Sequence, residues 1–243
     1  MSNSNQTLQY TYKFIFPDGA TRVFEVRLNA HDLSLIHEPR AKYPAWAKLA
    51  NHKCQDCPLS EAEHPYCPTA AGLVDLIDFC GDLQSIQEVT VVVEVPQRTY
   101  SKATSLQVGI SALAGIHMAS GGCPILAKLR PMVRFHLPFA DLDETAYRVF
   151  STYFLAQFFL ARQGQTPDWD MVKLAETYRN IAKVNSAFCE RLISTVKEDS
   201  ALNAITNLAT FGTFIEMCIN EDQIRSLQAF FTAYLEDPQL PVV

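Results

Sequence analysis

Three cysteines in one short polar segment are the residues of this chain most suited to chemistry. Cys54 and Cys57 form a C-x-x-C pair, and Cys67 follows ten residues later. A C-x-x-C turn lets two thiolates converge on one centre, and a third cysteine at this distance can return to the same centre. We therefore predict a thiolate metal or iron–sulfur site with Cys54, Cys57 and Cys67 as its core.

Proline follows cysteine more often than chance allows, which strengthens this prediction. The chain has seven cysteines and thirteen prolines in 243 residues, so a shuffled sequence would hold fewer than one Cys-Pro pair. It holds three: Cys57-Pro58, Cys67-Pro68 and Cys123-Pro124. A Cys-Pro pair also ends the ligand run of bacterial ferredoxins, where the following proline cannot donate to a regular ladder.

Reduced cysteines in a loop, without metal, are the plain alternative. Free cysteine prefers apolar burial, however. The neighbours of the three cysteines are instead charged or polar: Lys53, Gln55, Asp56, Glu61 and Glu63. The composition of the segment therefore favours a ligand role.

Cys123 is the predicted fourth ligand. It follows Gly121-Gly122, and a double glycine lets the backbone approach a bulky centre closely. His64 and His52 are the alternatives, because each lies within three residues of one of the other cysteines. The remaining cysteines lie in apolar helical patterns and are expected to be core residues: Cys80, Cys189 and Cys218.

The spacing also bears on the kind of centre. Structural zinc sites usually combine two paired knuckles, whereas here one pair is joined by two single cysteines. This pattern favours an iron–sulfur cluster such as [4Fe–4S] over the alternative, zinc. The expected function is that of a redox or sensory protein. A structural zinc site in a protein-interaction module and a metal-dependent enzyme with an open coordination position are the alternatives.

A group of basic residues follows Cys123 and is the predicted anion-binding site. Its members are Lys128, Arg130, Arg134 and His136. They are expected either to hold a small anionic ligand or to balance the charge of a tetrathiolate centre. A solvated face with ordinary ion pairs is the alternative. His117 lies in an apolar helical pattern and is expected to be a core histidine, and no sequence motif assigns a nucleophile or general base.

The elements that must position these residues predict an α+β fold. Residues 9–28 alternate in hydrophobicity as a β-hairpin does, and residues 88–95 predict a third strand. Helices are expected at about 69–80, 103–119, 147–161, 168–198, 200–219 and 221–236. We thus expect a small antiparallel sheet with a Cys-rich metal-binding loop in residues 1–140, followed by an α-helical bundle in residues 141–243.

Two helices point to a homodimer. Residues 147–161 are apolar on nearly every face, which indicates a buried central helix or one covered by a partner subunit. The helix at 168–198 carries apolar residues at 3-4 spacing with one polar member, Asn185. This seam either pairs with its own copy or faces the other helices of a bundle.

Composition excludes several partners. The net charge of -6 gives no basic face for nucleic acid or an anionic membrane. The polar start MSNSNQTLQY lacks the apolar run of a secretory signal, and an odd number of cysteines fits a reducing compartment. We expect a cytoplasmic protein.

The combination of C-x-x-C-P-L, Y-C-P and G-G-C-P before a helical tail resembles an uncharacterised bacterial family, a domain of unknown function. The resemblance covers most of the chain. It implies a bacterial cytosolic protein and brings no known activity.

Overall fold

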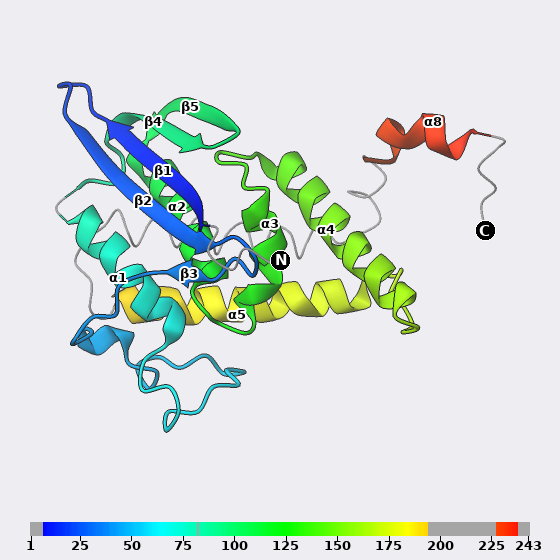
Figure 1. The fold of residues 1–243 in the computed structure, drawn as a ribbon, viewed down its shortest axis with the longest axis horizontal. Coiled ribbons are helices and arrows are strands. Elements are labelled where there is room, and N and C mark those ends of the chain that lie inside the picture. Colours follow the sequence, from blue (N-terminus) through cyan, green and yellow to red (C-terminus); the bar gives the residue numbers. More distant parts are fainter. Residues whose placement is uncertain (1–6, 82, 194–226, 238–243) are drawn as a thin grey trace.

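A five-stranded antiparallel sheet and the helices that pack on it make up an α+β fold (Figure 1). The computed structural model describes residues 7–81, 83–193 and 227–237. The strands lie in the order β3-β2-β1-β4-β5. They are β1 (Thr7–Ile15), β2 (Thr21–Asn29), β3 (Leu35–Ile36), β4 (Glu88–Val95) and β5 (Arg98–Ser105). The described α-helices are α1 (Pro68–Cys80), α2 (Leu106–Ser120), α3 (Arg130–Arg134), α4 (Leu142–Arg162), α5 (Val172–Ile193) and α8 (Thr232–Leu235). Short 3-10 helices are η1 (Ala45–Ala47), η2 (Leu126–Leu129) and η3 (Ala229–Phe231).

The predicted hairpin is confirmed as β1 and β2, which pair from Thr7↔Asn29 to Ile15↔Thr21. Alternate residues of β1 face the core, so Tyr12 and Phe14 are fully buried while their neighbours keep contact with water. Alternation over nine residues therefore identified both the strand and its buried face.

The strand predicted at 88–95 is confirmed as β4, but the helix predicted from residue 103 begins later. Residues 98–105 form β5, which pairs with β4 from Val95↔Arg98 to Glu88↔Ser105. A strand rich in Thr, Ser and Tyr at a sheet edge shows little apolar periodicity, because most of its side chains are not buried. Helix α2 then starts at Leu106, where the small apolar run becomes continuous.

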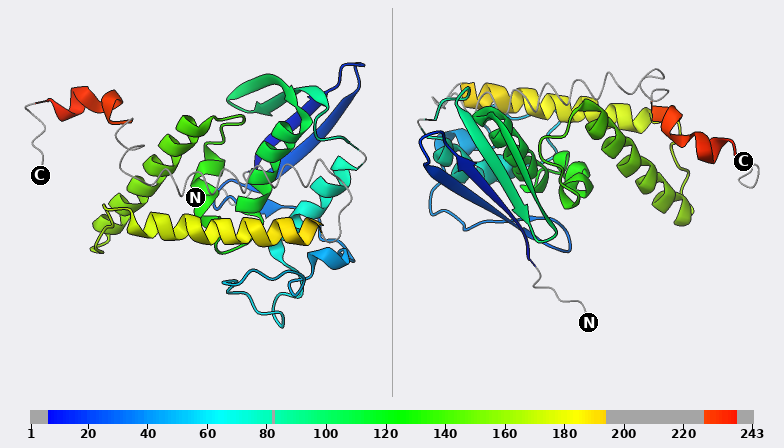
Figure 2. Two further views of the ribbon diagram at one scale, coloured as in Figure 1. Left: turned by 180° about the vertical axis from the view of Figure 1, so that it is seen from behind. Right: turned by 90° about the horizontal axis from the view of Figure 1, so that it is seen from above.

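Helices α1 and α2 cover the apolar face of the sheet (Figure 2). Leu113 of α2 is fully buried there, together with Leu106 at its start. His117 of α2 is 4% exposed, and its Nδ1 lies 2.8 Å from the carbonyl oxygen of Gly72 in α1. The prediction of a core histidine is thus confirmed, and this histidine joins the two helices.

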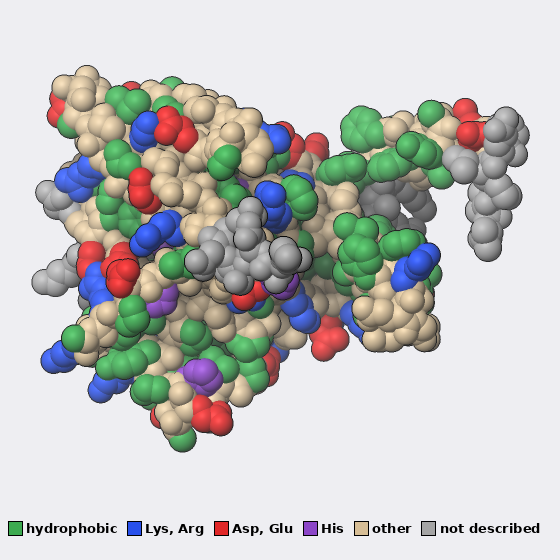
Figure 3. Space-filling view, viewed as in Figure 1, with side chains coloured by type: hydrophobic (Ala, Val, Ile, Leu, Met, Phe, Trp, Pro, Cys, Tyr) green, Lys and Arg blue, Asp and Glu red, His purple; other side chains and the backbone are tan. Residues whose placement is uncertain are grey.

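Helix α4 is more exposed than the sequence predicted. Leu155 and Phe159 are each 54% exposed, and hydrophobic side chains gather over α4 and α8 in Figure 3. Within the described ranges α4 is therefore no buried central helix. Coverage by a partner subunit stays a prediction, as does a domain boundary near residue 140. No helix of the described part of the chain is long and apolar enough to cross a membrane.

Helix α5 buries its 3-4 seam inside its own chain. Tyr178, Ile181 and Phe188 are nearly inaccessible, and Asn185 is 4% exposed. The seam therefore packs against other parts of its own chain, as in the second interpretation of the sequence. It is not a surface on which two copies of α5 pair. The predicted helix at 200–219 lies outside the described residues, and of the one at 221–236 only η3 and α8 are described.

Candidate metal centre

Cys54 and Cys57 lie in the long loop between β3 and α1. The Cys57 N–H donates to the Cys54 carbonyl at 3.1 Å, which closes the C-x-x-C segment into a turn. A bridge between Lys48 and Tyr66 joins the two ends of the loop. The two thiols therefore lie on a turn within a loop whose two ends are hydrogen-bonded to each other.

Cys67 is the residue that caps the N-terminus of α1. Its N–H donates to the Ala47 carbonyl at 2.9 Å, and its own carbonyl accepts from Ala71 N–H at 2.8 Å. Pro68 occupies the first helical position, where no backbone donor is needed. The Cys-Pro pair thus starts a helix here, and the positive end of the helix dipole lies at the thiol.

The Gly121-Gly122 turn brings Cys123 close to the start of α1, where Cys67 lies. A Cβ on Gly121 would lie 2.7 Å from the His117 carbonyl oxygen and 3.2 Å from Thr69 Cα, so only glycine allows this approach to the start of α1. Gly122 follows with a φ of +97°, a left-handed conformation. The Cys123 sulfur accepts backbone N–H groups from Ile125 and Leu126.

All four predicted cysteines line one small cavity, of about 20 Å³. Burial, together with the nearby thiols of Cys67, Cys57 and Cys123, raises the pKa of the Cys54 thiol to about 11. Four thiols that oppose one another's ionisation lie within electrostatic reach of each other. Three segments that are distant in sequence therefore converge here.

The described residues do not form a ready site for a bare metal ion. No group of three or more His, Cys, Asp or Glu side chains in the described ranges is placed so that it could hold one ion. The prediction of a preformed metal-binding loop is thus not supported by the geometry. The four cysteines nevertheless line one cavity.

Thr69 adds an orphaned polar atom to this cavity. It lines the cavity beside the cysteines, and it is 1% exposed. Its buried Oγ1 has no hydrogen-bond partner in the described part of the chain. A buried hydroxyl without a partner costs about 1–3 kcal/mol, so a sulfur acceptor placed in the cavity would relieve this cost.

Arg191 of α5 is the site residue that the sequence reasoning missed. It is 2% exposed, lines the cavity and donates from Nη1 to the carbonyls of Trp46 and Lys48, each at 2.6 Å. Its Nη2 lies 3.4 Å from the His52 carbonyl. Burial lowers the pKa of this guanidinium, whereas the thiols of Cys67, Cys54 and Cys57 raise it.

A signal for Arg191 was present in the sequence. Val184 and Phe188 precede it at seven and three residues, so a charged residue occupies an apolar helical stripe. A cation at such a position is nearly always paired or bonded when buried. The stripe did not reveal its partners, because backbone carbonyls of a distant loop leave no trace in the sequence.

The two histidines proposed as alternative ligands are placed differently. His52 lines the cavity, but its ring is exposed and its Nδ1 lies 3.7 Å from Glu190 Oε2. His64 is exposed in the loop and does not line the cavity. An ion pair between Lys183 and Asp56, at 2.6 Å, is a further contact of the loop with α5.

The predicted basic group does not converge on one point. Lys128 donates to Thr177 Oγ1 at 3.2 Å, and Arg130 donates to the Asp32 carbonyl at 3.3 Å. Arg134 is exposed with its guanidinium 5.6 Å from the Phe135 ring centroid. His136 lines a larger cavity that is separate from the cysteines.

The other cysteines play no part in this cavity. Cys80 is fully buried in α1, as predicted for a core residue, and Cys189 is half-buried in α5. Cys218 lies outside the described residues. Cys54, Cys57, Cys67 and Cys123 are free thiols.

The fold and the cavity together define an α+β protein with a four-cysteine site held between a loop, two helix ends and α5. The chain belongs to the family described as Domain of unknown function (DUF6901), whose model matches residues 10–232. No curated protein and no solved structure matches the chain. The family therefore spans both the sheet and the helices, and it carries no activity with it.

Proposed function

We propose that Cys54, Cys57, Cys67 and Cys123 hold an iron–sulfur cluster and that the protein is a redox or sensory protein of a reducing cytoplasm. The observation that carries the proposal is the convergence of four cysteines, from three separate segments, on one cavity. Four cysteines are the usual ligand set of a [4Fe–4S] cluster. The unpartnered Thr69 hydroxyl supplies a donor that a cluster sulfur would accept.

The sequence pattern of one C-x-x-C pair and two single cysteines favours a cluster over a single zinc ion. In a tetrathiolate zinc site all four sulfurs lie about 2.3 Å from one ion. In a four-iron cluster each cysteine binds a different iron, so the four sulfurs stand farther apart. The cavity of about 20 Å³ is about the size of one water molecule, so it must widen to admit a cluster.

The residues around the cavity also suit a charged sulfur centre. Cys123 already accepts two backbone N–H groups, and Cys67 lies at the positive end of α1. Arg191 adds a buried positive charge. Hydrogen bonds and cations near the sulfurs raise the reduction potential of a cluster, because they stabilise its more negative reduced state.

A bound cluster would supply one-electron redox chemistry, and the chain itself would set its potential and its exposure. Arg191 links the Cys loop to α5 through three carbonyls. A change in cluster charge would alter the position of this guanidinium, and α5 would carry that change into the helical half. This is the basis for a sensory role.

Anaerobic purification, with analysis of iron, acid-labile sulfide and zinc per chain, tests the proposal. We expect a brown protein with a broad visible absorption band and comparable amounts of iron and sulfide. A colourless protein with one zinc per chain would replace the cluster by the structural zinc alternative. A metal held by only three of the cysteines, with an open position, would favour the enzyme alternative.

A further inference from the structure

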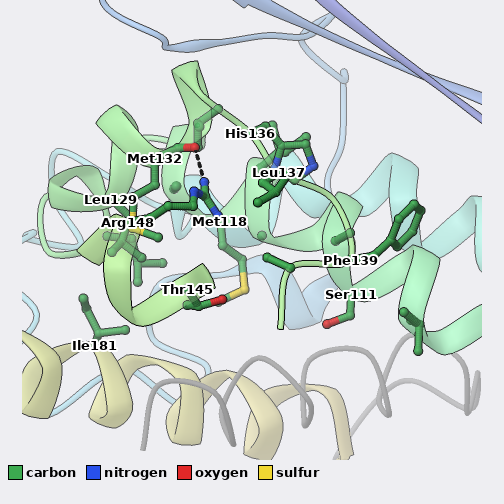
Figure 4. A pocket seen from close by; sticks show the side chains of 18 of the residues that line it. Ser111, Met118, Leu129, Met132, His136, Leu137, Phe139, Thr145, Arg148 and Ile181 are labelled. Atoms are coloured by element: carbon green, nitrogen blue, oxygen red, sulfur yellow. Dashed lines mark hydrogen bonds between the residues drawn. The ribbon is translucent and has the colours of Figure 1, made fainter. Parts of the chain in front are cut away.

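A second cavity, of about 570 Å³, lies between α2, the η2–α3 segment, the start of α4 and α5 (Figure 4). It shares no lining residue with the cysteine cavity. Its volume falls in the range of about 300–1,000 Å³ that is typical of small-molecule sites. The cavity is therefore large enough for an organic ligand and distinct from the proposed cluster.

Most of its wall is apolar. Small residues of α2 let a ligand approach the helix backbone, and two methionines supply flexible side chains that adapt to a hydrocarbon surface. These wall residues are Ala112, Gly115, Ala119, Met118, Met132 and Ile181. A ligand that fills this space must be mainly apolar, because most of the wall cannot form hydrogen bonds with it.

Two cations, Arg148 and Lys102, stand among the polar side chains of the wall. Arg148 Nη2 donates to the carbonyls of Met132 and Phe135, at 2.7 and 3.2 Å, and Figure 4 shows the first of these bonds. The described residues give Arg148 no ion pair and no acceptor for its Nε or Nη1. Lys102 lies with Nζ 6.0 Å from the Phe139 ring centroid, and both residues line the cavity.

His136 is a further donor on the same wall. The Tyr12 hydroxyl lies 2.5 Å from His136 Nε2, and no other partner of this buried hydroxyl is described. Burial lowers the pKa of His136 to about 3, so the ring is neutral near pH 7, and burial raises the pKa of Tyr12. Because the Tyr12 hydroxyl has no other described acceptor, we assign it as the donor to Nε2, which leaves the ring proton on Nδ1.

One carboxylate also borders the cavity, and it is engaged elsewhere. Asp141 caps α4, where its Oδ1 accepts the Glu144 N–H at 2.8 Å and the Glu144 side chain accepts the Asp141 N–H. It offers no pairing to Arg148 or Lys102 among the described ion pairs. The charged side chains on the wall are thus two cations and one carboxylate that is hydrogen-bonded elsewhere, and most of the remaining wall is apolar.

We propose that this cavity binds an amphipathic carboxylate, a molecule with one carboxylate head and an aliphatic tail. The head accepts from Arg148 and His136, which Figure 4 places on one side of the cavity, and the tail lies against α2 and α5. Nη2 of Arg148 is taken up by the two carbonyls, so Nε or Nη1 donates a single charge-assisted hydrogen bond to one carboxylate oxygen. An alcohol would leave the cation unpaired, and an amine would be repelled by it.

Isothermal titration of the full-length protein with octanoate, octanol and octylamine, below their micelle concentrations, tests this proposal. We expect octanoate to bind at least tenfold more tightly than octanol, and octylamine to give no binding. Equal affinities for octanoate and octanol, or no binding of octanoate, would overturn it. Because the two cavities share no lining residue, the result is independent of whether the cysteines bind a cluster.

Two variants assign the head-group contact. Arg148→Met removes the guanidinium and is expected to weaken octanoate binding at least tenfold while leaving octanol unchanged. Arg162→Met, on the exposed end of the same helix, is the matched control and should bind as the wild type does. Unchanged octanoate binding by Arg148→Met would contradict the proposed head-group site.

Arg148 also donates hydrogen bonds to two carbonyls near α3, so Arg148→Met could fail to fold. A second variant then tests the proposal. Ala112→Phe narrows the cavity from the α2 wall, where Ala112 is half-buried. We expect this variant to lose octanoate binding while circular dichroism shows its helix content unchanged. A folded Ala112→Phe protein that still binds octanoate would place the ligand elsewhere and overturn the proposal.

Discussion

Individual side chains decide what the cysteine cavity can hold. Cys54, Cys57, Cys67 and Cys123 supply thiols, whereas Thr69 and Arg191 supply the donor and the charge that a sulfur centre needs. The first four are visible in the sequence through their spacing and their prolines. Thr69 leaves no such signal, and the apolar stripe that contains Arg191 indicates its burial but not its contacts with a distant loop.

Cys123→Ala tests the fourth ligand. We expect the variant to lose most of the bound metal, because a three-cysteine set leaves one site of the centre without a thiolate. Cys80→Ala is the matched control, since Cys80 is a core cysteine of α1, and it should keep the full metal content. Metal analysis of both anaerobic proteins checks this, and a wild-type content in Cys123→Ala would exclude Cys123 as a ligand.

Arg191→Met tests the buried cation. Its removal leaves the carbonyls of Trp46 and Lys48 without their described donor, so we expect a loss of about 3 kcal/mol in the free energy of unfolding. Arg179→Met, on the exposed face of α5, should change stability by less than about 0.5 kcal/mol. Urea denaturation of both proteins measures the difference, and equal stabilities would show that Arg191 does not hold the loop.

At the scale of elements, helix ends and turns bring the thiols together. Helix α1 starts at Cys67, and the turn after α2 is pressed against that start. Helix α5 then holds the Cys54–Cys57 turn from the other side through Arg191 and Lys183. The site is therefore a junction of four elements and not a property of the loop alone.

Gly121→Ala tests the close approach of the two turns. The added Cβ would meet the His117 carbonyl at 2.7 Å, so the turn must shift and Cys123 must move away from the cavity. We expect metal loss and destabilisation of about 2 kcal/mol. Gly164→Ala is the control: its φ of +75° is strained for alanine, but nothing lies within 4 Å. It should keep its metal, and equal metal contents in the two variants would contradict this account.

The contact between α1 and α2 predicts a pH dependence. Burial lowers the pKa of His117 to about 4, below its usual 6.5, although the bond to Gly72 raises it. The unfolded chain therefore binds more protons between these two pKa values, so stability falls as the pH drops from about 6.5 to 4. The full loss is about 3 kcal/mol.

Urea denaturation of metal-free protein at pH 7 and pH 4.5 measures this loss. His117→Gln keeps a polar side chain without titrating, so its stability should change less over the same interval. A wild-type loss no larger than that of His117→Gln would show that His117 does not control the acid sensitivity.

Prediction from sequence succeeded where local patterns decide the structure. Alternation gave β1, β2 and β4, and apolar periodicity gave α1 and the buried seam of α5. It failed at β5, whose polar side chains hide its pairing with β4. It also missed the 570 Å³ cavity, because Arg148 and His136 come together only through the packing of α2, α3 and α4.

The whole molecule presents an unusual apolar surface on α4. Leu155, Phe158 and Phe159 are about half exposed, and Phe158 and Phe159 also contact each other. The predicted homodimer would use this surface, since the seam of α5 is buried within its own chain. Exposed patches of this kind commonly mark contacts between proteins.

Light scattering at micromolar concentration tests the homodimer. We expect a mass of twice 27.2 kDa for the wild type and a single 27.2 kDa for Phe159→Asp. Val23→Asp, which changes an exposed valine of β2, is the control and should remain dimeric. A wild-type mass of one chain would end the dimer prediction.

Iron K-edge X-ray absorption on the anaerobically purified protein tests the central claim most directly. If the four cysteines hold a cluster, the spectrum will show an all-sulfur shell at about 2.3 Å and a short iron–iron distance. Both should be absent from Cys123→Ala. A folded wild-type protein without iron, or iron with a nitrogen and oxygen shell and no iron neighbour, would contradict the assignment of the cysteine cavity as an iron–sulfur site.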